Sequence, residues 1–369
     1  MQPVRVAIVG TGNIARHHME SLRPLCGGEQ GGGEQGRLAQ VVAAADIDRP
    51  MLAAFCAEHG IPRGYRDLDD LLSAVHPDLV HVCTPPGLHH DQAQSCLQAG
   101  ASVLVEKPPA LSLRELDQLV ADEGAAGPWH ATVFQHRFGS AARKLRALTR
   151  AGTLGRPLLA ICHTTWFRDQ AYFDAGWRGG WDMEGGGPTM GHGIHQMDLL
   201  LDVLGDWAEV SAIARRQERR MDTEDVSLAH VTFATGAVAS VVNSVLSPRE
   251  ESYLRFDFTR ATIELTHLYG YGDDDWRVTP APGHERQVLA AWKDGETGTP
   301  SGHRAQFAEV LRCLRAGTRP PVTLSESRRT LALVTAIYAS AFTGTAIRPA
   351  DLGHPSPFYR RMDGDGARW

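Results

Sequence analysis

An apolar run that ends in a glycine turn and leads into a helical pattern constrains the fold of this chain most. Residues 4–9 read VRVAIV, and GTGNIA follows directly at 10–15. An apolar run of this length, interrupted only by Arg5, is typical of a strand buried on both faces of a parallel sheet. The same alternation of apolar strand and helix continues through 38–60 and 77–124. Strands separated by helices predict right-handed βαβ crossovers and a doubly wound parallel sheet.

The composition is that of an ordinary soluble globular protein. The 369 residues indicate two domains, and a net charge of -6 offers no basic surface for nucleic acid. We see neither a signal peptide nor an apolar stretch near the roughly 18 residues of a membrane span. Six cysteines are scattered without a CxxC pair, which favours a reducing cytoplasm. We therefore expect a cytoplasmic protein without nucleic-acid or membrane partners.

The GTGNIA turn has the G-x-G-x-x-A form of a dinucleotide-binding motif. Gly10 permits the tight turn, and Gly12 lets the backbone approach a pyrophosphate at the helix N-terminus, which begins with Asn13 and Ile14. A strand-helix turn that binds nothing is the alternative. The position of the turn after the first strand favours cofactor binding.

Asp46 ends the second strand, where a carboxylate can accept hydrogen bonds from the adenosine ribose. It comes later than the usual spacing, because a duplicated GGEQ within residues 26–36 lengthens the preceding loop. The carboxylate also repels a 2′-phosphate and so favours NAD, whereas the nearby Arg49 keeps NADP open.

The next two strands end in CTPPGLHH (83–90) and VEKPPA (105–110). Both ends lie at the carboxyl edge of the sheet, where open α/β folds bind ligands. Lys107 follows Glu106 and precedes two prolines, so its backbone is restricted. A solvated surface charge is the alternative, but beside a nicotinamide this ammonium would stabilise an alkoxide.

The chain resembles the Gfo/Idh/MocA oxidoreductases over nearly its whole length. The motifs are GTGNIA, TPPGLHH, AGASVLVEKPPA, VFQHRF, AGTLGRP and WRGGWDMEGGGPTMGHGIHQMD. The resemblance implies that Lys107 and His195 are catalytic, and that Gly10, Gly12 and Asp46 bind the cofactor. It also places Thr84, Pro85, His89 and Glu106 beside the nicotinamide.

After residue 130, strand-like runs follow one another with few intervening helices. This pattern predicts a second, α+β domain built on a large, predominantly antiparallel sheet. We divide the chain into a Rossmann domain at 1–130, a substrate-binding and oligomerisation domain at 131–350, and a tail at 351–369. The resemblance implies a homodimer or homotetramer.

The stretch GGGPTMGHGIHQMD at 185–198 contains two histidines on a predicted helix from Met190 to Leu204. His192 and His195 supply two imidazoles without a third ligand at recognisable spacing, so we predict no metal. A satisfied core histidine is the general alternative for His195, but the motif context favours catalysis.

One departure from the family pattern lies one turn before His195. Many relatives carry an aspartate or sometimes an asparagine there, whereas this chain has Gly191. We expect His192 and Asp198 to contact the substrate, with His192 taking over part of the missing contact and Asp198 also helping to hold His195. The segment 166–181 is rich in aromatic residues, which are more often core or interface. From it we predict the substrate contacts Arg168, Trp177 and Arg178.

These residues predict reversible hydride transfer between a nicotinamide and a carbinol of a sugar, cyclitol or sugar acid. His195 would remove the hydroxyl proton, and Lys107 would stabilise the alkoxide. Two alternatives remain: an NAD-dependent glycosidase that uses transient oxidation, and a non-catalytic nucleotide-binding sensor or co-regulator.

Overall fold

The computed structural model describes residues 2–27, 37–367 and 369, and the GGEQ duplication lies largely outside them. The chain forms two compact units. The first contains the chain up to Ala110, residues 115–133 and residues 303–327, and the second contains the remainder. Residues 303–327 belong to the first unit although they lie far along the chain from the rest of it. The tail belongs to the second unit, in which Phe358 and Met362 are buried.

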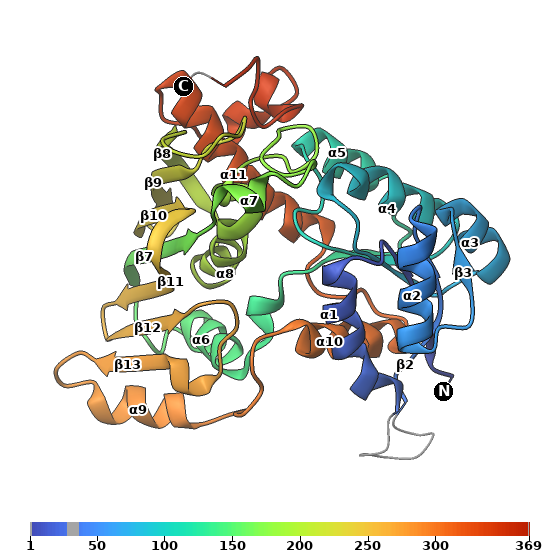
Figure 1. Ribbon diagram of the computed structural model, residues 1–369. Coiled ribbons are helices and arrows are strands. Elements are labelled where there is room, and N and C mark those ends of the chain that lie inside the picture. The colour runs from blue at the N-terminus through green and yellow to red at the C-terminus, as the bar shows by residue number, and fades with distance from the viewer. Residues whose placement is uncertain (1, 28–36, 368) are drawn as a thin grey trace. The chain divides into compact units, whose positions relative to one another are not determined.

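A six-stranded sheet of order β3-β2-β1-β4-β5-β6 forms the centre of the first unit (Figure 1). All neighbouring strands are parallel, which confirms the doubly wound prediction. The strands are β1 (Val4–Val9), β2 (Ala39–Ala45), β3 (Gly64–Tyr65), β4 (Leu79–Val82), β5 (Ser102–Val105) and β6 (His130–Thr132). The helices are α1 (Asn13–Leu22), α2 (Arg49–His59), α3 (Leu68–Val75), α4 (His89–Gln98), α5 (Leu113–Leu119) and α10 (His303–Ala316).

Helix α10 explains why residues 303–327 rejoin the first unit. It packs against α1 and β1, and Phe307 and Leu311 enter the same apolar core as Ile8 and Leu79. Burial of these side chains removes apolar surface from water and offsets the cost of closing a long loop.

A seven-stranded sheet of order β13-β12-β11-β7-β10-β9-β8 forms the second unit. Only β7 and β10 pair in parallel, so the prediction of a mainly antiparallel sheet is confirmed. The strands are β7 (Pro157–Phe167), β8 (Trp207–Arg215), β9 (Val226–Phe233), β10 (Val238–Ser244), β11 (Leu246–Phe258), β12 (Ala261–His267) and β13 (Trp276–Pro280). The helices are α6 (Ser140–Arg150), α7 (Gln170–Phe173), α8 (Ile194–Leu204), α9 (Glu285–Lys293) and α11 (Leu324–Thr343).

Short turns of helix connect these elements. They are the 3₁₀ turns Arg23–Cys26, Pro86–Leu88, Gln135–Phe138, Asp273–Asp275, Pro349–Leu352 and Pro357–Tyr359, and the π turn Thr189–Gly193 that leads into α8.

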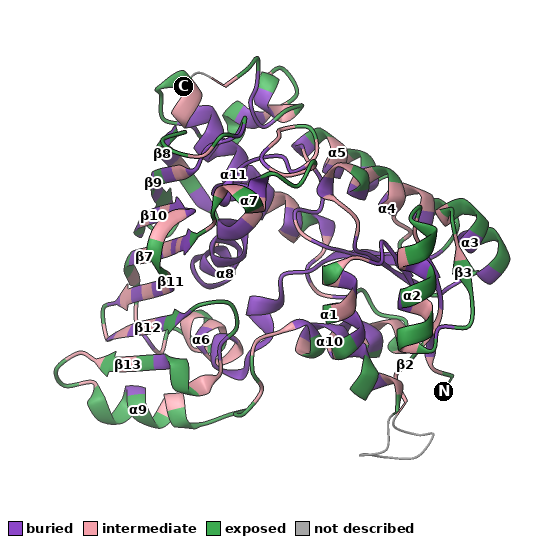
Figure 2. Cartoon of the chain, viewed as in Figure 1, coloured by how far each residue is buried: buried purple, intermediate pink, exposed green. Residues whose placement is uncertain are grey.

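Helix α8 packs on β7 and β11, and every one of its residues is buried, as Figure 2 shows by its purple colour. The predicted helix is therefore confirmed, but all its faces are enclosed by protein. The outer face of the sheet differs, because residues alternate along β9: Ala229 and Val231 are buried, whereas Leu228 and His230 are exposed. Within the described residues, no helix has the length and apolarity that crossing a bilayer requires.

Candidate active site

The glycine turn between β1 and α1, in the first unit, exposes backbone at Gly12 that no described side chain covers. Gly10 has a φ of +81°, and a Cβ there would lie 2.8 Å from the carbonyl oxygen of Cys83, so this position excludes a side chain. A Cβ built on Gly12 meets no described atom within 4 Å. The N-terminus of α1, which begins with Asn13 and Ile14, has no side-chain cap among the described residues. Uncapped N–H groups beside an open glycine fit a pyrophosphate.

Asp46 lies beside this turn, directly after β2. Its Oδ2 accepts hydrogen bonds from the Thr11 backbone N (2.7 Å) and hydroxyl (2.9 Å), and its Oδ1 accepts one from the Asp48 N (2.9 Å). These bonds fix the Asp46 carboxylate next to the glycine turn, and a carboxylate in this place fits the hydroxyls of a ribose.

His89 joins the two motif segments at the carboxyl edge of the sheet. Its Nδ1 lies 2.6 Å from the Pro108 carbonyl oxygen and its Nε2 lies 2.8 Å from that of Thr84. Burial lowers the pKa of His89, whereas its hydrogen bonds to the two carbonyl oxygens oppose that shift. The Thr84 hydroxyl donates to Gln92 Oε1 at 2.6 Å. His89 therefore ties the segment after Pro85 to the segment that carries Lys107.

Glu106 is held from two sides by histidines that the sequence analysis missed. Its Oε1 accepts hydrogen bonds from Nε2 of His18 (2.9 Å) and of His303 (3.3 Å), and its Oε2 accepts one from the Lys107 backbone N (3.1 Å). Burial raises the pKa of Glu106, but the hydrogen bonds and charges of the two imidazoles outweigh it and hold the pKa well below its usual range. The carboxylate thereby fixes the backbone at Lys107.

The ligand atoms of His18, Glu106 and His303 lie within 4.8 Å of one another, a spacing that a metal ion would accept. Both imidazoles direct Nε2 to the same carboxylate oxygen, so hydrogen bonds already satisfy all three groups. Holding Glu106 in place is enough to explain this cluster without a metal ion. No local spacing signals it, since His18 lies on α1 and His303 on α10.

His195, in the second unit, is presented by bare backbone that packs closely on its neighbours. A Cβ at Gly187 would lie 1.8 Å from the Glu224 carbonyl oxygen, and one at Gly193 would lie 1.8 Å from Asn243 Oδ1. The π turn Thr189–Gly193 ends two residues before the histidine, and such turns are frequent at functional sites. The glycines let this turn lie against the sheet.

The ring of His136 stacks on His195, with centroids 5.2 Å apart and planes inclined by 28°. Its Nε2 hydrogen-bonds the Tyr269 carbonyl oxygen at 2.9 Å, and its own carbonyl accepts a hydrogen bond from Tyr271. His136 belongs to the VFQHRF motif at residues 133–138, from which the sequence predicted no site residue. It supports the imidazole of His195 from one face.

Glu224 anchors the turn that leads to His195. Its carboxylate accepts hydrogen bonds from the backbone N of Gly187 and Thr189 and from the Tyr338 hydroxyl, each at 3.0 Å. Burial raises the pKa of Glu224 to about 7 even though these donors oppose the shift. The position of the triple glycine therefore depends on a fully buried carboxyl group.

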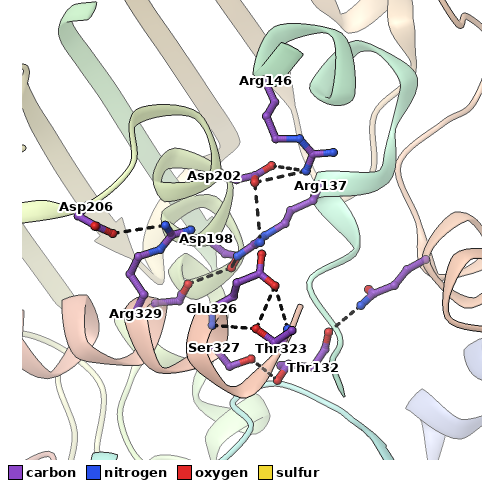
Figure 3. Close-up of polar contacts among 12 residues, drawn as sticks. Thr132, Arg137, Arg146, Asp198, Asp202, Asp206, Thr323, Glu326, Ser327 and Arg329 are labelled. Carbon is purple, nitrogen blue, oxygen red and sulfur yellow. Dashed lines mark hydrogen bonds and ion pairs between the residues drawn. The ribbon is translucent and has the colours of Figure 1, made fainter. Parts of the chain in front are cut away.

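Asp198 has other partners than those we expected (Figure 3). Its two oxygens accept hydrogen bonds from Nε and Nη2 of Arg137, both at 2.6 Å, and Oδ1 accepts a third from Thr330 at 2.9 Å. Asp202 pairs with Arg146 at 3.0 Å in the same network. A fully buried carboxylate engaged in this way is not available to substrate, which corrects our expectation. Its hydrogen bonds also do not go to His195.

The other predicted substrate residues gather around Tyr172. The guanidinium of Arg178 lies 4.0 Å from the Tyr172 ring centre and 4.1 Å from that of Trp177, and that of Arg168 lies 5.5 Å from Tyr172. The Tyr172 hydroxyl is 3.4 Å from Nε2 of His192. The sequence therefore identified residues that the fold brings together, but Tyr172 at their centre was not among the predicted site residues.

Two family models match the chain. The oxidoreductase family with an NAD-binding Rossmann fold matches residues 4–128, and the GFO/IDH/MocA C-terminal domain matches residues 142–264.

Relatives match nearly the whole length. D-apiose dehydrogenase of Paraburkholderia graminis is 26% identical over 95% of this chain and 91% of its own. D-glucoside 3-dehydrogenase of Escherichia coli is 25% identical, over 94% and 97%. The structure of the WlbA dehydrogenase from Bordetella pertussis in complex with NADH and UDP-GlcNAcA is 27% identical, with a TM-score of 0.79 and coverage of 94% and 99%. The two matching domains and these full-length similarities confirm the resemblance, and the chain belongs to the Gfo/Idh/MocA family of oxidoreductases.

Proposed function

We propose that this protein is an NAD-dependent dehydrogenase that oxidises a carbinol of a sugar, cyclitol or sugar acid, or catalyses the reverse reduction. The main support for this proposal is the glycine turn at Gly12 beside Asp46. The open glycine and the uncapped end of α1 match a pyrophosphate, and the Asp46 carboxylate matches a ribose. The relatives named above support the substrate class, since they are dehydrogenases of D-apiose and D-glucosides.

Residues of the first unit would bind the cofactor. Gly10, Gly12, Asn13 and Ile14 would hold the pyrophosphate, and Asp46 would accept the ribose hydroxyls in place of the Thr11 donors. Thr84, Pro85, His89 and Glu106 would shape the nicotinamide side. Bound NAD would accept the hydride from the carbinol carbon. Asp46 favours NAD over NADP, because a carboxylate repels a 2′-phosphate.

His195 would remove the hydroxyl proton as the carbon–hydrogen bond breaks, because a neutral imidazole is a base near pH 7. Lys107 would stabilise the negative charge that develops on the oxygen. His192, Arg168, Trp177 and Arg178 would contact the substrate through hydrogen bonds and ring stacking.

To test this, the purified protein is incubated with NAD, then with NADP, and with a panel of inositols, aldoses, amino sugars and sugar acids. The absorbance of the reduced nicotinamide measures turnover. We expect one substrate class to reduce NAD, and Lys107→Ala and His195→Ala to lower kcat at least 100-fold. Arg286→Ala, on exposed α9, serves as the control. Tightly retained NAD with a cleaved glycoside and no net reduction would replace the proposal with the redox-assisted glycosidase. Nucleotide binding without turnover of any compound would favour the sensor.

We also infer a cytoplasmic homodimer or homotetramer that forms through the outer face of the seven-stranded sheet. One row across this face runs through His163, Val242, Leu228 and Ile213 on adjacent strands, and Leu228 and Ile213 are 43% and 52% exposed. Exposed apolar side chains on the open face of β9 and of the edge strand β8 favour a covering partner. Light scattering should show that the double variant Leu228→Glu/Ile213→Glu is a monomer. A mass equal to that of the wild type would exclude this face as the subunit interface. All six cysteines are free thiols, which fits a reducing compartment.

A further inference from the structure

Gly191 differs from the other glycines of its turn, because neither its backbone nor its packing requires glycine. A Cβ at Gly187 or Gly193 would collide with neighbouring atoms, whereas a Cβ at Gly191 would meet only one described atom within 4 Å. That atom is Oε1 of Glu184, at a van der Waals distance of 3.5 Å. The side-chain space one turn before His195 is therefore bordered by a carboxylate from another segment.

Glu184 directly precedes the triple glycine, and its side chain is only 5% exposed. Its Oε2 accepts a hydrogen bond from the Gly179 backbone N at 2.6 Å, and its Oε1 pairs with Nη1 of Arg178 at 3.1 Å. A buried carboxylate with an arginine partner is fixed in place, since breaking such a pair leaves an uncompensated charge.

The pair formed by Glu184 and Arg178 continues towards His192. Nη1 of Arg178 also hydrogen-bonds the Tyr172 hydroxyl, and that hydroxyl lies 3.4 Å from Nε2 of His192. The ring of His192 meets the edge of Trp166 with centroids 5.0 Å apart. Glu184 is thus the first member of a polar chain that orients the arginine, the tyrosine and the histidine.

We propose that Glu184 is the positioning carboxylate of this site, which supplies from the preceding turn the negative charge that Gly191 does not carry. It fixes the Arg178–Tyr172–His192 chain and places a carboxylate oxygen beside the helical turn of His195. The inference deepens the proposed function and rests on it. Sequence inspection favoured His192 and Asp198 for this compensation, but Asp198 is engaged by Arg137.

The experiment moves the carboxylate from one position to the other. Glu184→Ala should lower kcat/KM at least about tenfold. Gly191→Asp in the wild-type background should also lower it, because two carboxylates in contact repel each other. In the double variant, the aspartate extends into the space that Glu184 vacates, and we expect it to recover at least about threefold over Glu184→Ala. A purely structural role of Glu184 would leave the double variant as impaired as Glu184→Ala.

A matched control is Glu296→Gln, which alters another Glu–Arg pair, 3.2 Å from Arg143 on the surface, and should leave kcat/KM unchanged. The imidazole NMR signal of His192 gives a readout independent of turnover, and it should shift in Glu184→Gln but not in the control. The inference would be overturned if the wild type is active, the double variant shows no recovery over Glu184→Ala, and the His192 signal does not shift. A wild type that turns over no polyol, with the His192 signal still shifted, would instead count against the proposed function alone.

Discussion

Glu106 and Glu224 are both fully buried glutamates that each support a predicted catalytic segment, yet their pKa values shift in opposite directions. Glu106 accepts hydrogen bonds from two imidazoles and its pKa lies well below the usual range. Glu224 accepts hydrogen bonds from two backbone amides and a tyrosine, and its pKa rises to about 7. Both side chains are buried, so the different hydrogen-bond donors account for the opposite shifts.

The largest effect is expected from removing Glu106. Glu106→Ala leaves His18 and His303 buried without their shared acceptor, and we expect a loss of about 3 kcal/mol or more in the free energy of unfolding. Urea denaturation followed by circular dichroism measures it, with Glu58→Ala on the surface as the control. Because the folded pKa lies below the unfolded value, this stabilisation is present above the unfolded pKa of about 4.5. It is lost as the pH falls through the folded pKa. If Glu106→Ala were as stable as the wild type at pH 7, the hydrogen bonds of Glu106 to the two imidazoles would not stabilise the fold, and the contrast with Glu224 would fail.

Glu224 should show the opposite pH dependence. Its folded pKa of about 7 exceeds the unfolded value of 4.5, so the folded state binds more protons and stability falls as the pH rises between these values. The contribution is about 3 kcal/mol. Unfolding free energies of wild type and Glu224→Gln between pH 4.5 and 7.5 should differ in slope, with the downward slope reduced in the variant. Parallel curves would refute this assignment.

A smaller effect is expected where glycine packs against the sheet beside Glu224. Gly193→Ala places a Cβ 1.8 Å from Asn243 Oδ1 and should cost about 1–3 kcal/mol. Gly191→Ala makes only an ordinary contact with Glu184 and should change stability by less than about 1 kcal/mol. Thermal unfolding of the two variants compares them directly, and equal losses would show that the turn tolerates neither side chain.

The smallest effect on stability is expected at Gly12. A Cβ there meets no described atom, so Gly12→Ala should alter the free energy of unfolding by less than about 0.5 kcal/mol. The same methyl group would lie where the pyrophosphate is proposed to bind. Calorimetry should therefore show an NAD affinity at least about tenfold lower than that of the wild type. Unchanged affinity would mean that the phosphates bind elsewhere.

The candidate cofactor residues could be proposed from the sequence because the alternation of strands and helices predicts which strand ends share an edge of the sheet. Gly10, Gly12 and Asp46 meet at one edge because strand ends of a parallel sheet gather there. His18 and His303 could not be assigned to Glu106, because each comes from a different helix. Asp198 was misassigned because helical spacing gives the direction of a side chain but not the arginine that faces it.

Local patterns along the chain predicted the parallel and antiparallel sheets, the glycine turn and the helix that carries His195. Hydrophobic periodicity and glycine placement are local properties, and they specify each element before it packs. Packing then set which buried carboxylate meets imidazole, guanidinium or amide, and it placed residues 303–327 in the first unit. Those outcomes depend on contacts between residues far apart in the chain, which local patterns do not encode.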